Sequence, residues 1–194
     1  MKVLGITGGV GSGKSKVLNY LREAYGASVC QMDETARELQ RRGTPCFERI
    51  VREFGREVVG EDGELDRAAL GKIVFADAGK LERLNEIVHP EVLLKVRRDI
   101  REKAKENVRL YVVEAALLPV AGRELCDELW YIYADERVRR ERLSRSRGYT
   151  GEKTSQMIAS QPGEEMFRKA CTVVIDNSGT FEDTKRQIGE KLKI

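Results

Sequence analysis

The sequence is poor in the residue types from which metal centres and disulfide frameworks are built. It contains one histidine and four cysteines in 194 residues, and no two of the cysteines form a C-x-x-C pair. Zinc sites need closely spaced His and Cys ligands, and small disulfide-stabilised folds need dense, regularly spaced cysteines. We therefore expect neither kind of framework, and we expect Cys30, Cys46, Cys126 and Cys171 to be reduced thiols.

Long apolar runs and a strong charge excess are also lacking. No apolar run approaches the length of a membrane span, and the apolar stretch at the amino terminus is too short for a signal peptide. The 35 Lys and Arg residues nearly balance the 32 Asp and Glu residues, which leaves a net charge of +3. We therefore expect a cytoplasmic protein without a nucleic-acid or membrane partner. Its oligomeric state stays open.

Short apolar blocks alternate with stretches of helical spacing, which predicts an α/β fold with a parallel sheet. The expected strands are Val3–Thr7, Ala27–Met32, Leu110–Val113, Leu129–Tyr133 and Val173–Ile175. The expected helices are Ser15–Ala24, Thr35–Arg42, Cys46–Phe54, Pro90–Lys105, Glu136–Ser144 and Phe181–Leu192.

Two intervals between expected strands are longer than one crossover helix requires. The first contains several helical patterns with breaks at Gly43, Gly55, Gly63, Gly79 and Pro90, and the second is rich in arginine. We interpret them as insertions into one nucleotide-binding core. The predicted division is a core of residues 1–33, 108–135 and 172–194, a helical substrate subdomain of residues 34–107, and a lid of residues 136–171.

The segment GGVGSGKS at residues 8–15 is the most specific motif in the chain. It satisfies G-x-x-x-x-G-K-S between an expected strand and an expected helix, which is the context of a phosphate-binding P-loop. Glycines let the backbone N–H groups wrap round phosphate oxygens, and the helix N-terminus adds positive potential. Lys14 is expected to reach the β and γ phosphates, and the Ser15 hydroxyl is expected to bind Mg²⁺. The expected nucleotide-binding residues are Gly8, Gly9, Val10, Gly11, Ser12, Gly13, Lys14, Ser15 and Lys16.

Acidic residues follow two of the expected strands, at the sheet edge where the P-loop begins. Asp33 is placed to orient or accept the proton of an attacking hydroxyl, although it also suits the N-cap of the following helix. Glu114 closes the third expected strand, where a carboxylate can hold Mg²⁺ or simply end the strand. The sequence leaves both alternatives open.

Arginine is concentrated between residues 137 and 147. Most of these side chains are expected on a solvated helix face, but one or two are expected to meet the transferring phosphate. His89 is expected to be structural on sequence grounds alone. The stretch Asp176–Gly179 mimics the D-x-x-G of GTPases, but no N-K-x-D follows it, which excludes a GTPase.

Taken together, these features resemble the dephospho-CoA kinase family over nearly the whole chain. The matching stretches are ITGGVGSGKS, Asp33, Phe54-Gly55, Asp62-Gly63 with Leu65-Asp66-Arg67, Val88-His89-Pro90, Leu117-Leu118, Arg142-Leu143, Ile158 with Gln161, and Val174 to Gly179. The resemblance implies transfer of the γ-phosphoryl group of ATP, with Mg²⁺, to the 3′-hydroxyl of dephospho-CoA.

The resemblance also implies roles for particular residues. Asp33, Lys14 and Arg142 are the catalytic candidates, and Arg142, Arg147 and Asn177 join the P-loop in binding ATP. Asp33, Arg37, His89 and Leu118 are the candidates for binding the acceptor. The alternatives are a P-loop kinase of another small metabolite or nucleoside, and a nucleotide-dependent regulatory switch.

The chain departs from the family's common pattern at several positions. Gln31 stands where the first aspartate of a D-x-D pair is common, and Ala116 to Val120 lacks a frequent glutamate. Met157 and Phe167 stand where Arg and Lys are common in the lid, with Arg168 and Arg147 as candidate substitutes.

Overall fold

The computed structural model describes residues 1–116, 118 and 122–192. The chain divides into two units, one made of residues 1–30 with 100–194 and the other of residues 31–99. The predicted three-part division into core, substrate subdomain and lid stays a prediction.

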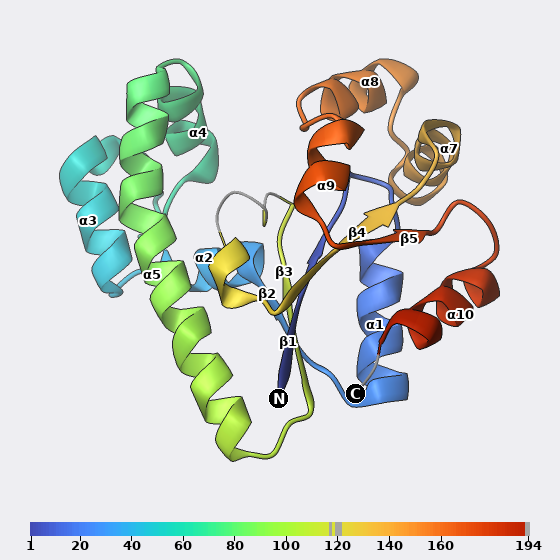
Figure 1. The fold of residues 1–194 in the computed structure, drawn as a ribbon. Helices are drawn as coiled ribbons and strands as arrows, with labels where there is room; N and C mark the ends of the chain where they lie inside the picture. Colours follow the sequence, from blue (N-terminus) through green and yellow to red (C-terminus); the bar gives the residue numbers. More distant parts are fainter. Residues whose placement is uncertain (117, 119–121, 193–194) are drawn as a thin grey trace. The chain divides into compact units, whose positions relative to one another are not determined.

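A five-stranded sheet with the order β2-β3-β1-β4-β5 organises the first unit (Figure 1). β1 pairs in parallel with β3 and β4, and β4 pairs in parallel with β5. The predicted α/β class with five strands is confirmed. The strands are β1 (Lys2–Thr7), β2 (Ser28–Gln31), β3 (Leu110–Glu114), β4 (Glu128–Tyr133) and β5 (Val173–Asp176).

The strand register decides which residues meet at the carboxyl edge of the sheet. Ile6 lies opposite Glu114, and Tyr133 lies opposite Asp176. Because the strands are parallel, the segments that leave them all emerge at this edge, where open α/β sheets bind their ligands. The P-loop follows β1 at the same edge.

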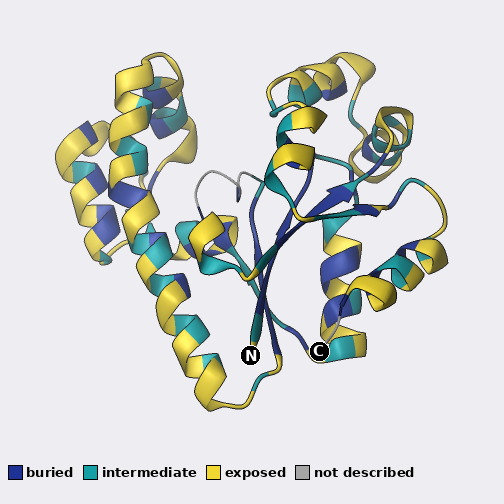
Figure 2. Ribbon diagram, viewed as in Figure 1, coloured by how far each residue is buried: buried dark blue, intermediate teal, exposed yellow. Residues whose placement is uncertain are grey.

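Two helices, α1 (Lys14–Tyr25) and α10 (Phe181–Lys191), pack side by side on the sheet (Figure 1). Val17, Leu18 and Leu21 of α1 are buried in one core with Trp130 of β4 and Ile188 of α10. Each such buried side chain stabilises the fold by about 1.5–3 kcal/mol. The central strands β1, β3 and β4 are accordingly mostly dark in Figure 2, whereas the helices keep an exposed face.

The segment between β4 and β5 is helical. It contains α7 (Glu136–Arg147), α8 (Gly151–Ala159) and α9 (Glu164–Ala170), and the short helix η2 (Arg123–Leu125) precedes β4. The arginine run of α7 starts after Asp135, whose carboxylate caps the helix by accepting the Arg137 N–H. Only the first of these helices was predicted from the sequence.

The regular structure of the second unit is helical, apart from Gln31 at the end of β2 and one antiparallel bridge between Val59 and Leu65. Its helices are α2 (Met32–Leu39), α3 (Pro45–Phe54), η1 (Arg56–Val58), α4 (Arg67–Phe75) and α5 (Ala78–Lys105), the last of which continues past residue 99. Thr44 caps α3 and Asp66 caps α4 through their side-chain oxygens, so that both helices begin at favoured capping residues.

The break expected at Pro90 is wrong, because Pro90 lies inside α5. The break expected at Gly79 falls slightly earlier, since α4 ends at Phe75 and α5 begins at Ala78. An interior proline costs a helix about 3 kcal/mol. The apolar face of α5, with Ile87, Val88 and Val92 buried, offsets that cost.

Asp33 was expected to close β2, but β2 ends at Gln31 and Asp33 lies in the first turn of α2. Gln31 is the N-cap residue, so the alternative role of Asp33 as the cap is excluded. Its carboxylate instead favours the helix by lying at the positive end of the helix dipole.

Candidate functional site

The P-loop connects β1 to α1 and takes a shape that only glycine suits at two positions. Gly11 and Gly13 have φ angles of 78° and 89°, in the left-handed region. A Cβ atom at Gly13 would lie 2.3 Å from Asn177 Nδ2, and one at Gly11 would lie 2.9 Å from the Arg139 carbonyl oxygen. The loop is therefore closely packed from behind, which leaves its backbone in one fixed shape.

The N-terminus of α1 supplies positive potential at the end of the loop. Its N-cap is Gly13, and its first turn contains no acidic residue, so the helix dipole is not neutralised locally. The Ser15 and Lys16 side chains are exposed in this turn. An anion fits such a terminus without further donors.

Lys14 lies against the start of the same loop. Its ammonium donates to the Gly8 carbonyl oxygen at 2.7 Å and lies 3.9 Å from the Glu114 carboxylate. Glu114 is 7% exposed and ends β3, next to β1. A buried carboxylate is costly unless it is paired, and Lys14 provides a partner. The two predicted site residues Lys14 and Glu114 are thus brought together.

A buried polar network supports the loop from behind. The Asn177 side chain donates to the Ser12 carbonyl oxygen at 2.7 Å and accepts the Thr184 hydroxyl proton at 2.8 Å. Arg142 donates to the carbonyl oxygens of Asn177 at 2.8 Å and of Ser12 at 3.3 Å. Asn177 and Arg142, both predicted to bind ATP, are therefore seen holding the loop, and their contact with ATP stays a prediction.

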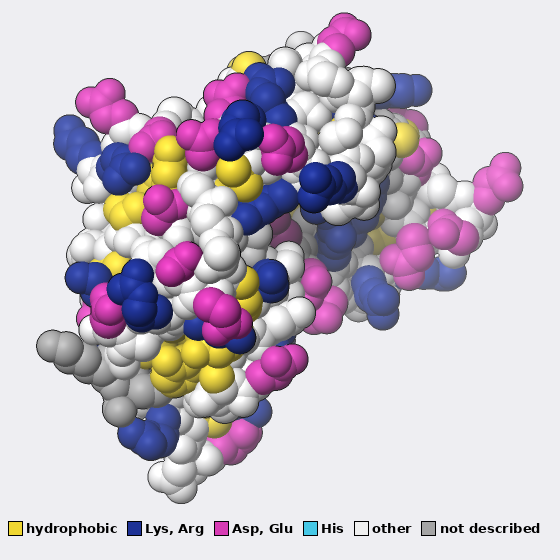
Figure 3. Space-filling model, turned by 90° about the vertical axis from the view of Figure 1, so that its right-hand side faces the viewer, with side chains coloured by type: hydrophobic (Ala, Val, Ile, Leu, Met, Phe, Trp, Pro, Cys, Tyr) yellow, Lys and Arg dark blue, Asp and Glu magenta, His cyan; other side chains and the backbone are white. Residues whose placement is uncertain are grey.

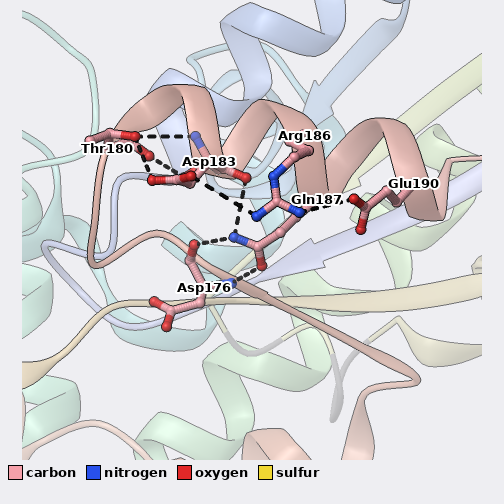
Figure 4. A network of polar contacts seen from close by, with 7 residues as sticks. Asp176, Thr180, Asp183, Arg186, Gln187 and Glu190 are labelled. Atoms are coloured by element: carbon pink, nitrogen blue, oxygen red, sulfur yellow. Dashed lines mark hydrogen bonds and ion pairs between the residues drawn. The ribbon is translucent and has the colours of Figure 1, made fainter.

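The stretch after β5 is fixed by α10 (Figure 4). Gln187 accepts the Asp176 N–H at 2.9 Å and donates to the Asp176 carbonyl oxygen at 2.8 Å. Thr180 caps α10 by accepting the Asp183 N–H. Asn177 is thus held between two anchored residues, Asp176 and Thr180.

Side chains of the segment between β4 and β5 also contact the P-loop at Val10. Gln161, in the turn between α8 and α9, accepts the Val10 N–H at 2.8 Å. Arg139 of α7 donates to the Val10 carbonyl oxygen at 2.8 Å and to Gln161 Oε1 at 3.2 Å. The sequence had indicated Gln161 as a match to the family and Arg139 as one of the arginines of residues 137–147, but it assigned no individual role to either of them or to Thr184.

The other arginines of α7 face different partners. Arg137 and Arg140 form ion pairs with Glu141 and Glu136 one turn away. On the face drawn in Figure 3, Lys and Arg side chains likewise lie interspersed with Asp and Glu. Arg147, predicted to bind ATP, is exposed, and its guanidinium carbon lies 5.9 Å from the centre of the Tyr149 ring.

The apolar lid residues noted in the sequence have a structural explanation in one case. Phe167 is 2% exposed, and its ring stacks on Tyr131 of β4 with the centroids 5.0 Å apart. An apolar ring suits this buried position, whereas a charged side chain there would lose its hydration. Nothing in the structure explains Met157.

Three candidates for acceptor binding lie in the unit of residues 31–99. Asp33 and Arg37 are one turn apart on α2 and therefore share a face, and both are exposed. Arg37 lines a cavity of about 310 Å³ together with Arg41 and Arg67. His89 is exposed on α5.

The fourth candidate, Leu118, is fully buried. A Cβ atom at Gly5 of β1 would lie 2.9 Å from its side chain, so the structure places Leu118 in the core. Its neighbours Leu117 and residues 119–121, on which part of the sequence resemblance rests, lie outside the described residues.

The described part of the chain shows neither a metal-binding cluster nor a membrane-spanning helix. Residues 1–116, 118 and 122–192 contain no cluster of three or more His, Cys, Asp or Glu side chains arranged to hold a metal ion. Within the same residues, no helix combines the length and the apolar character that crossing a bilayer requires.

Comparison with known proteins identifies relatives over almost the full length. The sequence model of the family described as dephospho-CoA kinase matches residues 2–183. The dephospho-CoA kinase of Carboxydothermus hydrogenoformans is 38% identical over 97% of this chain and 91% of its own. That of Enterococcus faecalis is 39% identical over 99% of this chain and 96% of its own.

Solved structures share the fold. A Thermus thermophilus protein of known crystal structure aligns with a TM-score of 0.78 and 34% identity, over 97% of this chain and 95% of its own. The dephospho-CoA kinase of Campylobacter jejuni aligns with a TM-score of 0.69 and 20% identity, over 98% of this chain and 95% of its own. A shikimate kinase from Acinetobacter baumannii, with a TM-score of 0.53 and 14% identity, covers 100% of this chain and 96% of its own.

Proposed function

Because the chain belongs to the dephospho-CoA kinase family, we propose that it transfers the γ-phosphoryl group of ATP to the 3′-hydroxyl of dephospho-CoA. The products are CoA and ADP. The observation that carries the proposal is the fixed P-loop with Lys14 beside it, in a chain that matches the family over residues 2–183.

ATP is the donor in this proposal, and its phosphates bind backbone N–H groups of the P-loop other than that of Val10, which Gln161 already accepts. The fit is supported by the positive φ angles of Gly11 and Gly13 and by the uncompensated N-terminus of α1. Lys14 neutralises charge on the terminal phosphates. The Ser15 hydroxyl and the Glu114 carboxylate would hold Mg²⁺, which supplies charge neutralisation to the phosphates when it is bound.

The acceptor is assigned to the helical residues 34–107, with residues 136–171 as the lid. Dephospho-CoA carries a diphosphate, and one guanidinium group can donate two parallel hydrogen bonds to the oxygens of a phosphate. One cavity of this unit is lined by Arg37, Arg41 and Arg67 together with a single carboxylate, that of Glu64, and its excess of positive charge supports this assignment. His89 and Leu118 remain candidates for acceptor binding.

Asp33 is assigned to the acceptor hydroxyl. As the hydroxyl oxygen bonds to the γ-phosphorus, the bond from that phosphorus to the bridging oxygen of ADP breaks, and the hydroxyl proton passes to the Asp33 carboxylate. Arg142 holds the P-loop carbonyl at Ser12 in place while the charge moves. Such a transfer depends on positioning and charge more than on covalent chemistry.

The proposal is tested by product analysis with ATP and dephospho-CoA, and with nucleosides and shikimate as competing acceptors. We expect CoA and ADP in equal amounts, with no comparable product from the other acceptors. Asp33→Asn keeps the shape and removes the proton acceptor, so turnover should fall by about 100-fold or more while ATP affinity changes little. CoA formation at the background rate, or an unaffected Asp33→Asn variant, would refute the assignment.

Several broader properties complete the proposal. The enzyme acts in the cytoplasm on a small molecule and needs no nucleic-acid or membrane partner. The near balance of 35 basic and 32 acidic residues supports this assignment.

A further inference from the structure

Val10 is held at both of its peptide groups by side chains from far along the chain. Its N–H is accepted by Gln161 Oε1 at 2.8 Å, and its carbonyl oxygen accepts from Arg139 Nε at 2.8 Å. The two side chains also bond to each other, since Arg139 Nη2 donates to Gln161 Oε1 at 3.2 Å. The three residues form a closed triangle of hydrogen bonds at Val10 of the phosphate loop.

Arg139 is distinct from its neighbours in the chemistry of its partners. Arg137 and Arg140 are paired with carboxylates, so their charge is largely neutralised. The hydrogen bonds seen for Arg139 go to a carbonyl and an amide oxygen, which are neutral. Asp135, one turn before Arg139, is engaged as the cap of α7.

The position of Arg139 directs its charge at the loop. A Cβ atom at Gly9 would lie 2.6 Å from Nη2 and 3.1 Å from Nη1 of Arg139, so the guanidinium packs directly against the Gly9 backbone. The Lys14 ammonium donates to the carbonyl oxygen of Gly8, the residue before Gly9. Two cations therefore flank the Gly8–Val10 segment.

We propose that Arg139 and Gln161 form a clasp on Val10 that positions the phosphate loop for the terminal phosphate of ATP. Gln161 orients the guanidinium, and the guanidinium fixes the loop. Among the described residues its side-chain hydrogen bonds go to neutral oxygens, so its positive charge stays beside the loop. Both are positioning residues, and they tie α7 and the α8–α9 turn to nucleotide binding. The inference rests on the proposed kinase activity for its functional part only.

The clasp is tested with Arg139→Met, Gln161→Met and the double variant. Methionine is of similar length and makes neither hydrogen bond. Arg140→Met is the matched control, because Arg140 is adjacent on α7 and bonds to Glu136 and Ser155 instead of the loop. Urea unfolding midpoints show whether each variant remains folded.

For each single variant we expect kcat/KM for ATP to fall about tenfold, with KM for dephospho-CoA within about twofold of the parent. The kcat/KM for ATP of the double variant should lie within about threefold of that of the less active single variant, because both residues act through Val10. Hydrogen exchange at the Val10 amide should become at least about tenfold faster in Gln161→Met and stay unchanged in Arg140→Met. In Gln161→Glu, which retains the acceptor oxygens, the Val10 amide should stay protected.

If the losses of kcat/KM in the two single variants multiply to about 100-fold in the double variant, the clasp is refuted. It is also refuted if each single variant has a kcat/KM within twofold of that of the parent. Unchanged Val10 exchange in Gln161→Met would refute it as well. If a methionine variant fails to fold, Arg139→Lys takes its place, since it keeps the charge but loses the paired contact with Val10 and Gln161. A parent protein that phosphorylates no dephospho-CoA refutes the proposed function, while Val10 exchange still decides whether the clasp exists.

Discussion

Replacing Thr184 by valine tests whether the buried network behind the phosphate loop stabilises the fold and the site. Thr184 is fully buried and donates its hydroxyl proton to Asn177 Oδ1 at 2.8 Å. Asn177, 3% exposed, donates in turn to the Ser12 carbonyl oxygen of the loop at 2.7 Å. Valine keeps the shape of threonine, so only the hydroxyl is removed.

The expected loss follows from the groups left without partners. Asn177 Oδ1 becomes a buried acceptor that has lost its donor, and such a group costs about 1–3 kcal/mol of unfolding free energy. The hydroxyl's second contact, to the Thr180 carbonyl oxygen at 3.3 Å, is long and adds little. We therefore expect a loss of about 1–3 kcal/mol, or about 2–4 °C in Tm for each kcal/mol.

The measurement is urea unfolding, with Thr154→Val as the matched control. Thr154 is 2% exposed on α8, and no hydrogen bond of its side chain is seen among the described residues. The same substitution there should cost less than about 0.5 kcal/mol. KM for ATP should rise in Thr184→Val only, because Asn177 then holds Ser12 less firmly. Equal losses at both sites would refute the idea that the Asn177 network supports the loop.

Three further outcomes are expected. Lys14→Met should lower kcat/KM for ATP by about 100-fold or more with an unchanged far-UV circular dichroism spectrum, because it removes a preorganised cation from the phosphates; near-parental activity would exclude Lys14 from the site. Pro90→Ala should raise the urea midpoint, by up to about 3 kcal/mol of stability, because it restores an N–H donor inside α5; a lowered midpoint would contradict this. Burial raises the pKa of the Cys126 thiol from 9.0 to about 12, so above pH 9 the unfolded thiol loses its proton while the folded one keeps it. The free energy of unfolding should therefore fall between pH 9 and 12, by at most about 1.4 kcal/mol per pH unit. Urea titrations at several pH values should show a weaker fall in Cys126→Ala. The same dependence on pH in both proteins would refute the raised pKa of Cys126.

The sheet and the P-loop were predictable because both leave strong local signals. Buried parallel strands appear as short apolar runs, and the P-loop combines glycines with a lysine at fixed spacing. Helices α4, α8 and α9 escaped prediction, although Asp66 and Thr150 are capping residues in front of the first two. At α5, the breaking signal of Pro90 was outweighed by burial along a long helix, which is a tertiary effect.

The arginines of α7 show that the sequence pattern alone does not decide which of them contact the phosphate loop. Two of them have a carboxylate one turn away that pairs with them: Arg137 is exposed, and Arg140 is partly buried and also donates to Ser155 of α8. Arg139 and Arg142 are three residues apart, which places them on one side of the helix, and both reach the phosphate loop. The helical spacing was visible in the sequence, but the partners at Val10 and Ser12 lie about 130 residues earlier in the chain. Only the folded sheet, which brings the end of β4 beside the end of β1, decides which arginines serve the loop.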